Sequence, residues 1–254
     1  MADMIRLRQI CLVAPALEPA VGHLASILGL EVCYRDANVA KYGLENALMP
    51  VDTILLEVVA PITANTAAGR FLQRTNGRGG YMAIFACDDP DRRARHASAL
   101  GVRTVNVLDY GPYHGVQLHP RDCRAAFIEF NHTEGSDNIA GAYPPAGPDW
   151  QKAIRTTITQ ALIGVELSSP DPAGLARHWS EIVESPLGRS ARGDPEIVLP
   201  NATLRFVAGD DELMTGLVMK VRDVAAVVAA ARSRGCLVGD DRFDLSGVTF
   251  RLQA

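Results

Sequence analysis

The 254-residue sequence lacks several features that mark common protein classes. It has no run of eighteen apolar residues, and its opening MADMIRLRQI lacks the apolar core of a secretory signal. A formal net charge of −4 argues against a sequence-independent nucleic-acid-binding protein, which would carry a basic surface. Five cysteines with no CxxC pair argue against a disulfide framework or a zinc site. We therefore expect a cytoplasmic protein with no membrane or nucleic-acid partner.

Familiar catalytic motifs are also missing. The chain contains no GxSxG and no HExxH sequence, and its glycine-rich RTNGRGG precedes a strand pattern instead of opening a helix. Hydrophobic residues make up 48% of the chain and charged residues 21%, which is typical of a globular protein. Function must therefore be inferred from the organisation of the chain.

An internal repeat is the strongest pattern that the sequence contains. An apolar strand, a turn, a helix and a small-residue exit occur in four copies, which begin near residues 10, 82, 163 and 217. The helices have apolar residues at helical spacing, such as Leu175, Trp179 and Ile182. Short extended segments follow each helix, for example VRTVNVL, GVQLHP and AAFIEF after the second. In the first copy we expect LEVCYRD and TILLEVVAP to be strands, with a loop through Asn46 between them.

The pattern predicts an α+β fold made of tandem βαβββ units, arranged as two domains in which helices cover mainly antiparallel sheets. Copies one and two would form a first domain over residues 1–135. A Gly- and Pro-rich linker is expected over residues 136–158, and copies three and four would form a second domain over residues 159–254. The sequence leaves open whether units also pair across the chain.

Polar residues interrupt three of the predicted apolar strands. Gln9 lies in IRLRQICLV, Glu57 in TILLEVVAP and Glu129 in AAFIEF. Because side chains alternate along a strand, each shares a face with apolar neighbours and is expected to be buried. A buried carboxylate needs a cation, a proton or hydrogen-bonding partners, so these residues are candidates for a site.

The paired βαβββ units, the segment from Pro61 to Leu72 and the motif HPRD at residues 119–122 together resemble the vicinal oxygen chelate superfamily. That superfamily includes glyoxalase I, methylmalonyl-CoA epimerase, extradiol dioxygenases and resistance proteins. The resemblance to the epimerases covers roughly residues 5 to 132. It implies that the paired units form vicinal-oxygen-chelate-type domains with cup-shaped mixed sheets. It places Gln9, Glu57, Met82 and Glu129 at the positions of the superfamily's metal ligands.

Met82 departs from the superfamily pattern, because a thioether is a poor ligand for a hard cation. One alternative is a divalent ion (Mn, Mg, Co, Ni or Zn) held by Gln9, Glu57 and Glu129. The other is a metal-free site in which the two carboxylates share a proton and act as general acid or base. A third, non-functional alternative pairs the glutamates with Arg or Tyr side chains. In the second half, the matching positions are Gly164, Arg205, Gly216 and Arg251, which cannot chelate a cation.

The resemblance implies an isomerase or lyase that moves a proton next to a carbonyl or thioester of a small organic acid. Glu57 and Glu129 would be catalytic. The candidates for substrate binding are Gln9, Met82, Tyr113, His114 and His119. The alternative is a non-catalytic protein that binds and sequesters a small molecule. Either function requires a small-molecule partner, and a homodimer is compatible with both.

Overall fold

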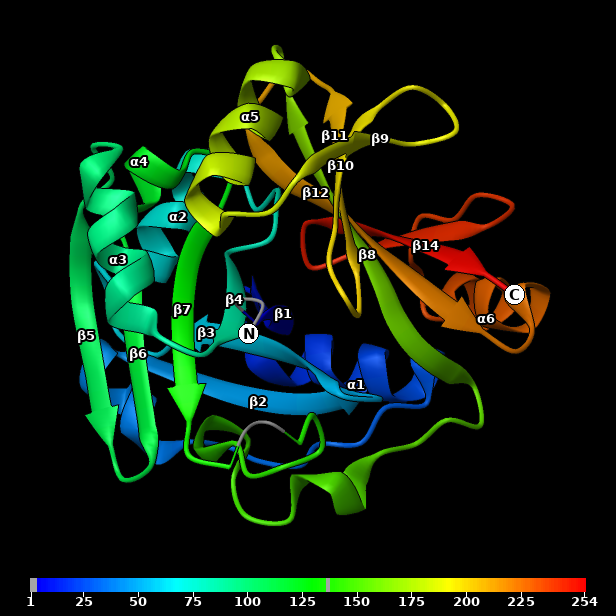
Figure 1. Ribbon diagram of the computed structural model, residues 1–254. Coiled ribbons are helices and arrows are strands. Elements are labelled where there is room, and N and C mark those ends of the chain that lie inside the picture. The colour runs from blue at the N-terminus through cyan, green and yellow to red at the C-terminus, as the bar shows by residue number, and fades with distance from the viewer. Residues whose placement is uncertain (1–3, 136–137) are drawn as a thin grey trace. The chain divides into compact units, whose positions relative to one another are not determined.

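The computed structural model describes residues 4–135 and 138–254, which form an α+β fold with two mixed sheets (Figure 1). Each sheet has seven strands, in the orders β2-β3-β1-β4-β7-β6-β5 and β13-β14-β12-β8-β11-β10-β9. Copies one and two supply the strands of the first sheet, and copies three and four supply those of the second. The predicted fold class is confirmed.

The first half of the chain contains copy one, which has one strand fewer than predicted (βαββ), copy two, which has the predicted βαβββ order, and two additional helices. Copy one comprises β1 (Ile5–Val13), α1 (Leu17–Leu28), the 3-10 helix η1 (Ala37–Tyr42), β2 (Leu44–Val51) and β3 (Ile54–Pro61), and α2 (Ala67–Thr75) follows it. Copy two comprises β4 (Met82–Cys87), α3 (Pro90–Ala99), β5 (Thr104–Tyr110), β6 (Tyr113–Leu118), the short α4 (Pro120–Cys123) and β7 (Phe127–Thr133).

The second half follows the connecting 3-10 helices η2 (Pro144–Ala146) and η3 (Trp150–Ala153); its copy three has the predicted βαβββ order, and its copy four has one strand fewer (βαββ). Copy three comprises β8 (Thr159–Ser169), α5 (Pro172–Val183), β9 (Leu187–Arg189), β10 (Pro195–Val198) and β11 (Thr203–Ala208). Copy four comprises β12 (Leu213–Val221), α6 (Val224–Ser233), β13 (Arg242–Leu245) and β14 (Val248–Gln253).

The strand assignment within copy one was partly wrong. The predicted strand LEVCYRD pairs only through a single bridge between Tyr34 and Leu48. The predicted loop through Asn46 is instead the regular strand β2, antiparallel to β3. Asn46 and Pro50 obscure this strand in the sequence, because both are typical of turns. Pro50 is compatible with β2 because that strand lies at the edge of its sheet.

Aspartate caps explain where three of the four repeat helices begin. The side chains of Asp89, Asp171 and Asp223 accept hydrogen bonds from backbone N–H groups three residues later, at the starts of α3, α5 and α6. These are the residues of the turn that the repeat predicted. The apolar faces also form as expected, since Trp179 and its helical neighbours on α5 are buried.

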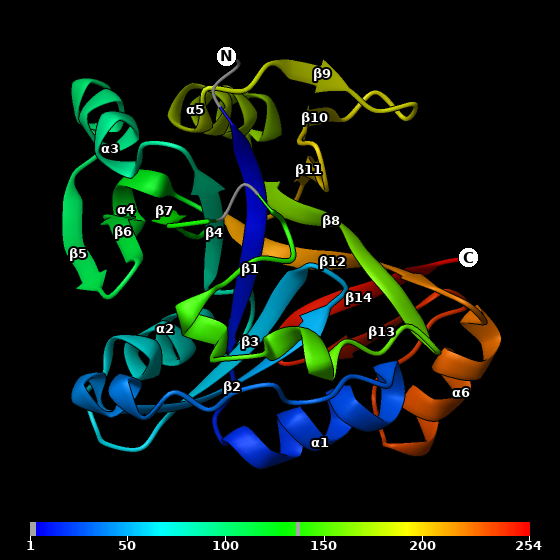
Figure 2. The ribbon, with the colours of Figure 1, turned by 60° about the horizontal axis from the view of Figure 1, so that its bottom comes forward.

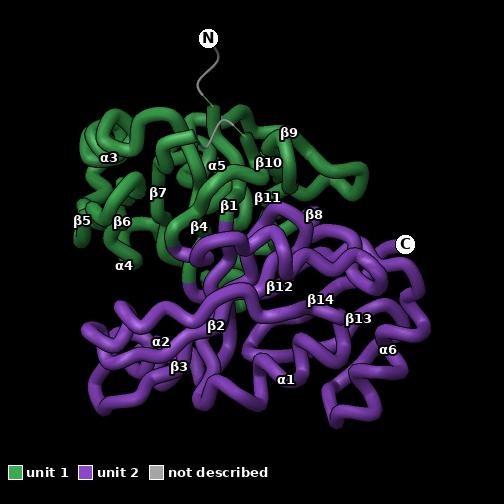
Figure 3. Tube along the Cα trace, turned by 90° about the horizontal axis from the view of Figure 1, so that it is seen from below, with its two compact units in different colours: residues 1–8, 82–144, 164–214 green, residues 9–81, 145–163, 215–254 purple. Residues whose placement is uncertain are grey.

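By packing, the described chain divides into two compact units, coloured separately in Figure 3. Unit 1 contains residues 4–8, 82–144 and 164–214, and therefore most of copies two and three. Unit 2 contains residues 9–81, 145–163 and 215–254, and therefore most of copies one and four. Compact packing thus groups the copies differently from the hydrogen-bonded sheets. The domain boundaries at residues 135 and 159 remain a prediction.

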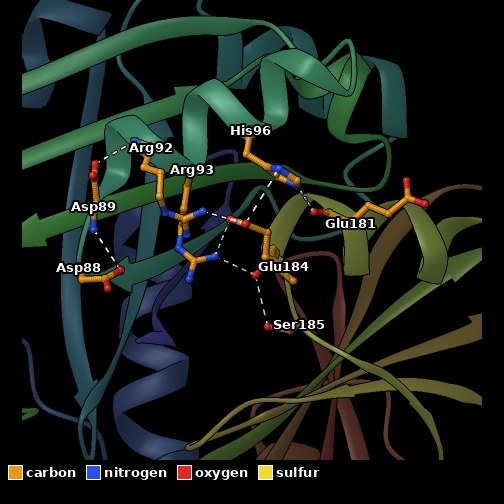
Figure 4. Close-up of polar contacts among 9 residues, drawn as sticks. Asp88, Asp89, Arg92, Arg93, His96, Glu181, Glu184 and Ser185 are labelled. Carbon is orange, nitrogen blue, oxygen red and sulfur yellow. Dashed lines mark hydrogen bonds and ion pairs between the residues drawn. The ribbon is translucent and has the colours of Figure 1, made fainter. Parts of the chain in front are cut away.

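In unit 1, the helices α3 and α5 are linked by a charged cluster (Figure 4). Arg92 and Arg93 of α3 converge on Glu184 at the end of α5, with N–O distances of 2.8 and 3.2 Å. Arg93 is fully buried and also donates to the carbonyl oxygen of Val183. Removal of one partner would leave a buried charge without its counter-ion, so the pair ties the two helices together.

In unit 2, the helices α1 and α6 lie side by side, as both ribbon views show (Figures 1 and 2). The hydroxyl of Thr159 at the start of β8 donates to the carbonyl oxygen of Leu28 at the end of α1, at 2.7 Å. None of the helices in the described part of the chain combines the length and apolar composition that a membrane span requires.

Candidate functional site

Glu57 is the centre of a buried polar cluster in unit 2. Gln9 Nε2 donates to Glu57 Oε2 at 2.8 Å, and Asn46 Nδ2 donates to Glu57 Oε1 at 2.7 Å. The strand register brings these groups together, because β3 pairs with β1 on one side and with β2 on the other. Glu57 is 8% exposed and the two amide residues are 3–4% exposed. The carboxylate therefore accepts hydrogen bonds from neutral donors at a position with little access to water.

The orientation of Asn46 is fixed by its second hydrogen bond. Its Oδ1 accepts from the backbone N–H of Asp36 at 2.8 Å, so its Nδ2 must face Glu57. Burial raises the pKa of the Glu57 carboxyl, and the hydrogen bonds from Asn46, Cys11 and Gln9 offset only part of this effect. The sequence did not point to Asn46, because the residue was assigned to a loop.

Glu129 is the centre of a second buried cluster, which lies in unit 1. The hydroxyl of Tyr113 donates to Glu129 Oε1, and Gln117 Nε2 donates to Oε2 at 2.8 Å. The register of β6 and β7 places Gln117 directly opposite Glu129. Glu129 is 2% exposed. Burial and the negative charge of Glu129 raise the pKa of the Tyr113 phenol well above its usual value, so Tyr113 keeps its proton and remains a donor.

A glycine makes the Tyr113–Glu129 hydrogen bond possible. Gly115 lies two residues after Tyr113 on the same face of β6, between Tyr113 and Glu129. A Cβ atom at position 115 would lie 2.9 Å from Tyr113 Cε1 and 3.1 Å from Glu129 Oε1. Any other residue would therefore displace the tyrosine ring or the carboxylate.

Two more aromatic rings and an arginine extend the Glu129 cluster. The Tyr113 ring stacks on Tyr110 and meets Tyr143 edge-on, with centroid distances of 4.8 and 5.9 Å. The guanidinium of Arg8 lies 4.4 Å from the centroid of Tyr143 and donates to the carbonyl oxygen of Ile139 at 3.1 Å. Burial is the main reason that the pKa of Arg8 falls to about 10.

The two glutamates belong to different compact units. Glu57 lies with Gln9 in unit 2, whereas Glu129 lies with Met82 in unit 1. Met82 is partly exposed and sits beside Phe127 in the register of β4 and β7. The convergence of all four residues on one site therefore remains a prediction. Within its own unit each carboxylate accepts hydrogen bonds from neutral donors. For Glu129 one of these donors is a tyrosine, which agrees with the non-functional alternative.

The donor sets fit a proton better than a divalent cation. Each oxygen of each glutamate accepts a hydrogen bond from an N–H or O–H group, so within its own unit each carboxylate faces hydrogen-bond donors. No group of three His, Cys, Asp or Glu side chains suited to a metal occurs among the described residues. A hard cation prefers several oxygen ligands, and neither cluster supplies them in that orientation.

His114 and His119 make polar contacts in unit 1 outside the Glu129 cluster. His114 lies between Asp109 and Asp91, with 3.1 Å from Nε2 to Asp91, and hydrogen bonding to Asp109 is the main cause of its raised pKa. His119 caps α4 by accepting from the backbone N–H of Arg121. A role of either histidine in substrate binding remains a prediction.

In copies three and four, one of the positions that match the first-half candidate residues forms an ion pair between strands. Arg205 lies 3.8 Å from Glu166 on the adjacent strand β8, which pairs with β11 in register. Glu212 is another acidic residue of this half of the chain. That residue pairs with Arg124.

No protein-family model matches this chain, and no curated protein matches it either. Among solved structures, a hypothetical protein from Staphylococcus aureus matches over 98% of this chain and 99% of its own, with a TM-score of 0.68 and 12% identity. That likeness shows that the two chains share a fold across their lengths.

Two epimerase structures match only half of the chain. Methylmalonyl-CoA epimerase in complex with methylmalonyl-CoA and NH4+ is 23% identical, covers 51% of this chain and 95% of its own, and has a TM-score of 0.45. The enzyme from Mycobacterium tuberculosis is 20% identical, covers 52% and 91%, and has a TM-score of 0.46. These values support no argument about activity.

Proposed function

We propose that this protein is an isomerase or lyase that transfers a proton at the carbon next to a carbonyl or thioester of a small organic acid. The observation that carries the proposal is Glu57, a buried carboxylate held by two neutral amides with a pKa raised by burial. A carboxylate with a raised pKa is a stronger base, and a base close to the operating pH transfers protons most effectively.

In this proposal Glu57 removes the proton. Gln9 and Asn46 hold its two oxygens in a fixed orientation, so little reorganisation is needed when the charge on the carboxylate changes. Glu129 is the second candidate base, with Tyr113 as the group that holds it. No step needs a metal ion, since neither donor set suits one.

Deuterium incorporation from D2O tests the proposal directly. The full-length protein is incubated with a panel of small acyl thioesters and 2-oxo acids, and exchange at the carbon next to the carbonyl is followed by proton NMR. We expect Glu57→Gln to slow exchange by about 100-fold or more, which is the range for loss of a general base. Glu45→Gln, at an exposed position on β2, is the matched control and should leave exchange unchanged.

A second variant tests the role of the amides. Asn46→Ala removes one donor to Glu57, so the pKa of that carboxyl should rise further, and the acidic limb of the pH–rate profile should move to higher pH. Loss of exchange in Glu129→Gln but not in Glu57→Gln would assign the base to Glu129 instead.

Non-catalytic binding is the second candidate function, and the closed hydrogen-bond set of Glu129, like that of Glu57, favours it. Both oxygens of that carboxylate are already satisfied within unit 1. Saturable binding of a thioester or acid without deuterium incorporation, and with equal affinity in Glu57→Gln, would establish this function and exclude the enzymatic one.

A further inference from the structure

Two buried polar groups in unit 1 lack the partners that such groups normally have. Asn131 Nδ2 and Thr133 Oγ1 have no hydrogen-bond partner among the described residues. Each residue is only 1% exposed. Most buried polar atoms in proteins form hydrogen bonds, because a polar group that is removed from water without a new partner lowers the stability of the fold. An unsatisfied pair on one strand therefore points to a missing partner molecule.

Strand alternation places the two groups on one face of β7. Glu129, Asn131 and Thr133 are spaced by two residues, so their side chains share that face. The residues paired with Asn131 on either side are small: Ala86 on β4 and Gly115 on β6. The Asn131 amide is thus flanked within the sheet by side chains too short to reach it with a polar group.

Positive charge and hydrogen-bond donors lie next to this face, and the face itself carries one negative charge, that of Glu129. Thr133 pairs with Tyr113 in the register of β6 and β7, and the Tyr113 ring meets Tyr143, over which Arg8 lies. The positive charge of Arg6 acts on Arg8 as well. Two buried arginines outnumber this single carboxylate and, together with an amide N–H and a hydroxyl, favour an anionic acceptor. The 1% exposure of Asn131 and Thr133 favours a small one.

We propose that this face of unit 1 binds the carboxylate of a small organic acid. Asn131 Nδ2 and the Thr133 hydroxyl donate to its oxygens, and the field of Arg8 and Arg6 favours its negative charge. The inference goes beyond the proposed function, because it concerns binding in unit 1 and holds whether or not Glu57 in unit 2 acts as a base.

The test measures the binding of acetate and of acetamide, which are similar in size and differ in charge, by saturation-transfer NMR on the full-length protein. Asn131→Leu and Thr133→Val replace each polar group with an apolar one of similar shape. We expect each to weaken acetate binding by about tenfold, as loss of one hydrogen bond to a charged group does. Thr104→Val, at an exposed position of β5, is the control and should bind like the wild type.

Thermal unfolding provides an independent measurement. Without ligand, Thr133→Val should be as stable as the wild type or more so, because it removes an unsatisfied buried hydroxyl. Acetate should raise the melting temperature of the wild type more than that of Thr133→Val. Absence of saturable acetate binding, acetate affinity unchanged in both variants, or acetamide binding as tight as acetate binding would each overturn the proposal. If Asn131→Leu does not fold, the comparison of Thr133→Val with Thr104→Val decides alone.

Discussion

Replacement of Gly115 by alanine tests the geometry of the Glu129 cluster with one methyl group. The new Cβ would lie 2.9 Å from Tyr113 Cε1, 3.1 Å from Glu129 Oε1 and 3.2 Å from the Tyr113 hydroxyl oxygen. Both contacted side chains are at least 97% buried, so neither can move into solvent. The methyl group must therefore push the tyrosine off the carboxylate or strain the strand.

The magnitude follows from three contributions. Overpacking in a full core costs about 1–3 kcal/mol. Loss of a hydrogen bond to a buried carboxylate costs about 1.5–3 kcal/mol. Alanine is favoured over glycine in a strand by about 0.5–1 kcal/mol. If Tyr113 moves, the clash is relieved but the hydrogen bond is lost, so the costs of overpacking and of hydrogen-bond loss do not add. We expect Gly115→Ala to lower the free energy of unfolding by about 2 kcal/mol.

The assay is urea unfolding followed by circular dichroism, with Gly188→Ala as control. At Gly188 on β9 an added Cβ would meet Glu196 no closer than 3.7 Å, so that variant should be neutral or stabilising. In a Tyr113→Phe background no hydroxyl remains to be displaced, and the cost of Gly115→Ala should shrink to that of the clash alone. The reasoning is refuted if Gly115→Ala is no more destabilising than Gly188→Ala.

Three further predictions concern titration and the helix pair. The pKa of Glu57 is raised in the folded state, so the wild type should lose stability as pH rises from the unfolded pKa, about 4.5, through the folded pKa. In urea unfolding, Glu57→Gln should flatten this slope above pH 4.5. Glu184→Gln should lower the free energy of unfolding by about 2–4 kcal/mol, because Arg93 stays buried without its counter-ion. This is contradicted if Glu184→Gln loses no more stability than a Glu→Gln variant at an exposed position. His114 should titrate above pH 6.5 in NMR spectra, and Asp109→Asn should move that titration to lower pH; no movement would show that the hydrogen bond between His114 and Asp109 is not formed in solution.

Local pattern was enough to predict the fold class. Strand alternation, helical spacing and the capping aspartates act within a few residues, so four similar segments could be read as one supersecondary unit. Copy one shows the limit of that approach. In β2, Asn46 and Pro50 have the local preferences of a turn, and only pairing with β3 holds the segment extended.

The sequence by itself also identified the two glutamates as candidates, because a carboxylate in an apolar strand is unusual in any tertiary structure. Which groups meet them was decided by the tertiary structure. Register brings Asn46 and Gln9 to Glu57 and Gln117 to Glu129, and a shift of one residue would turn each side chain to the other face. The grouping of copy two with copy three in one compact unit was decided in the same way, because contacts such as Arg93 with Glu184 join residues 91 positions apart. Hydrogen bonds and packing at such separations depend on how the folded elements are placed, which no local pattern specifies.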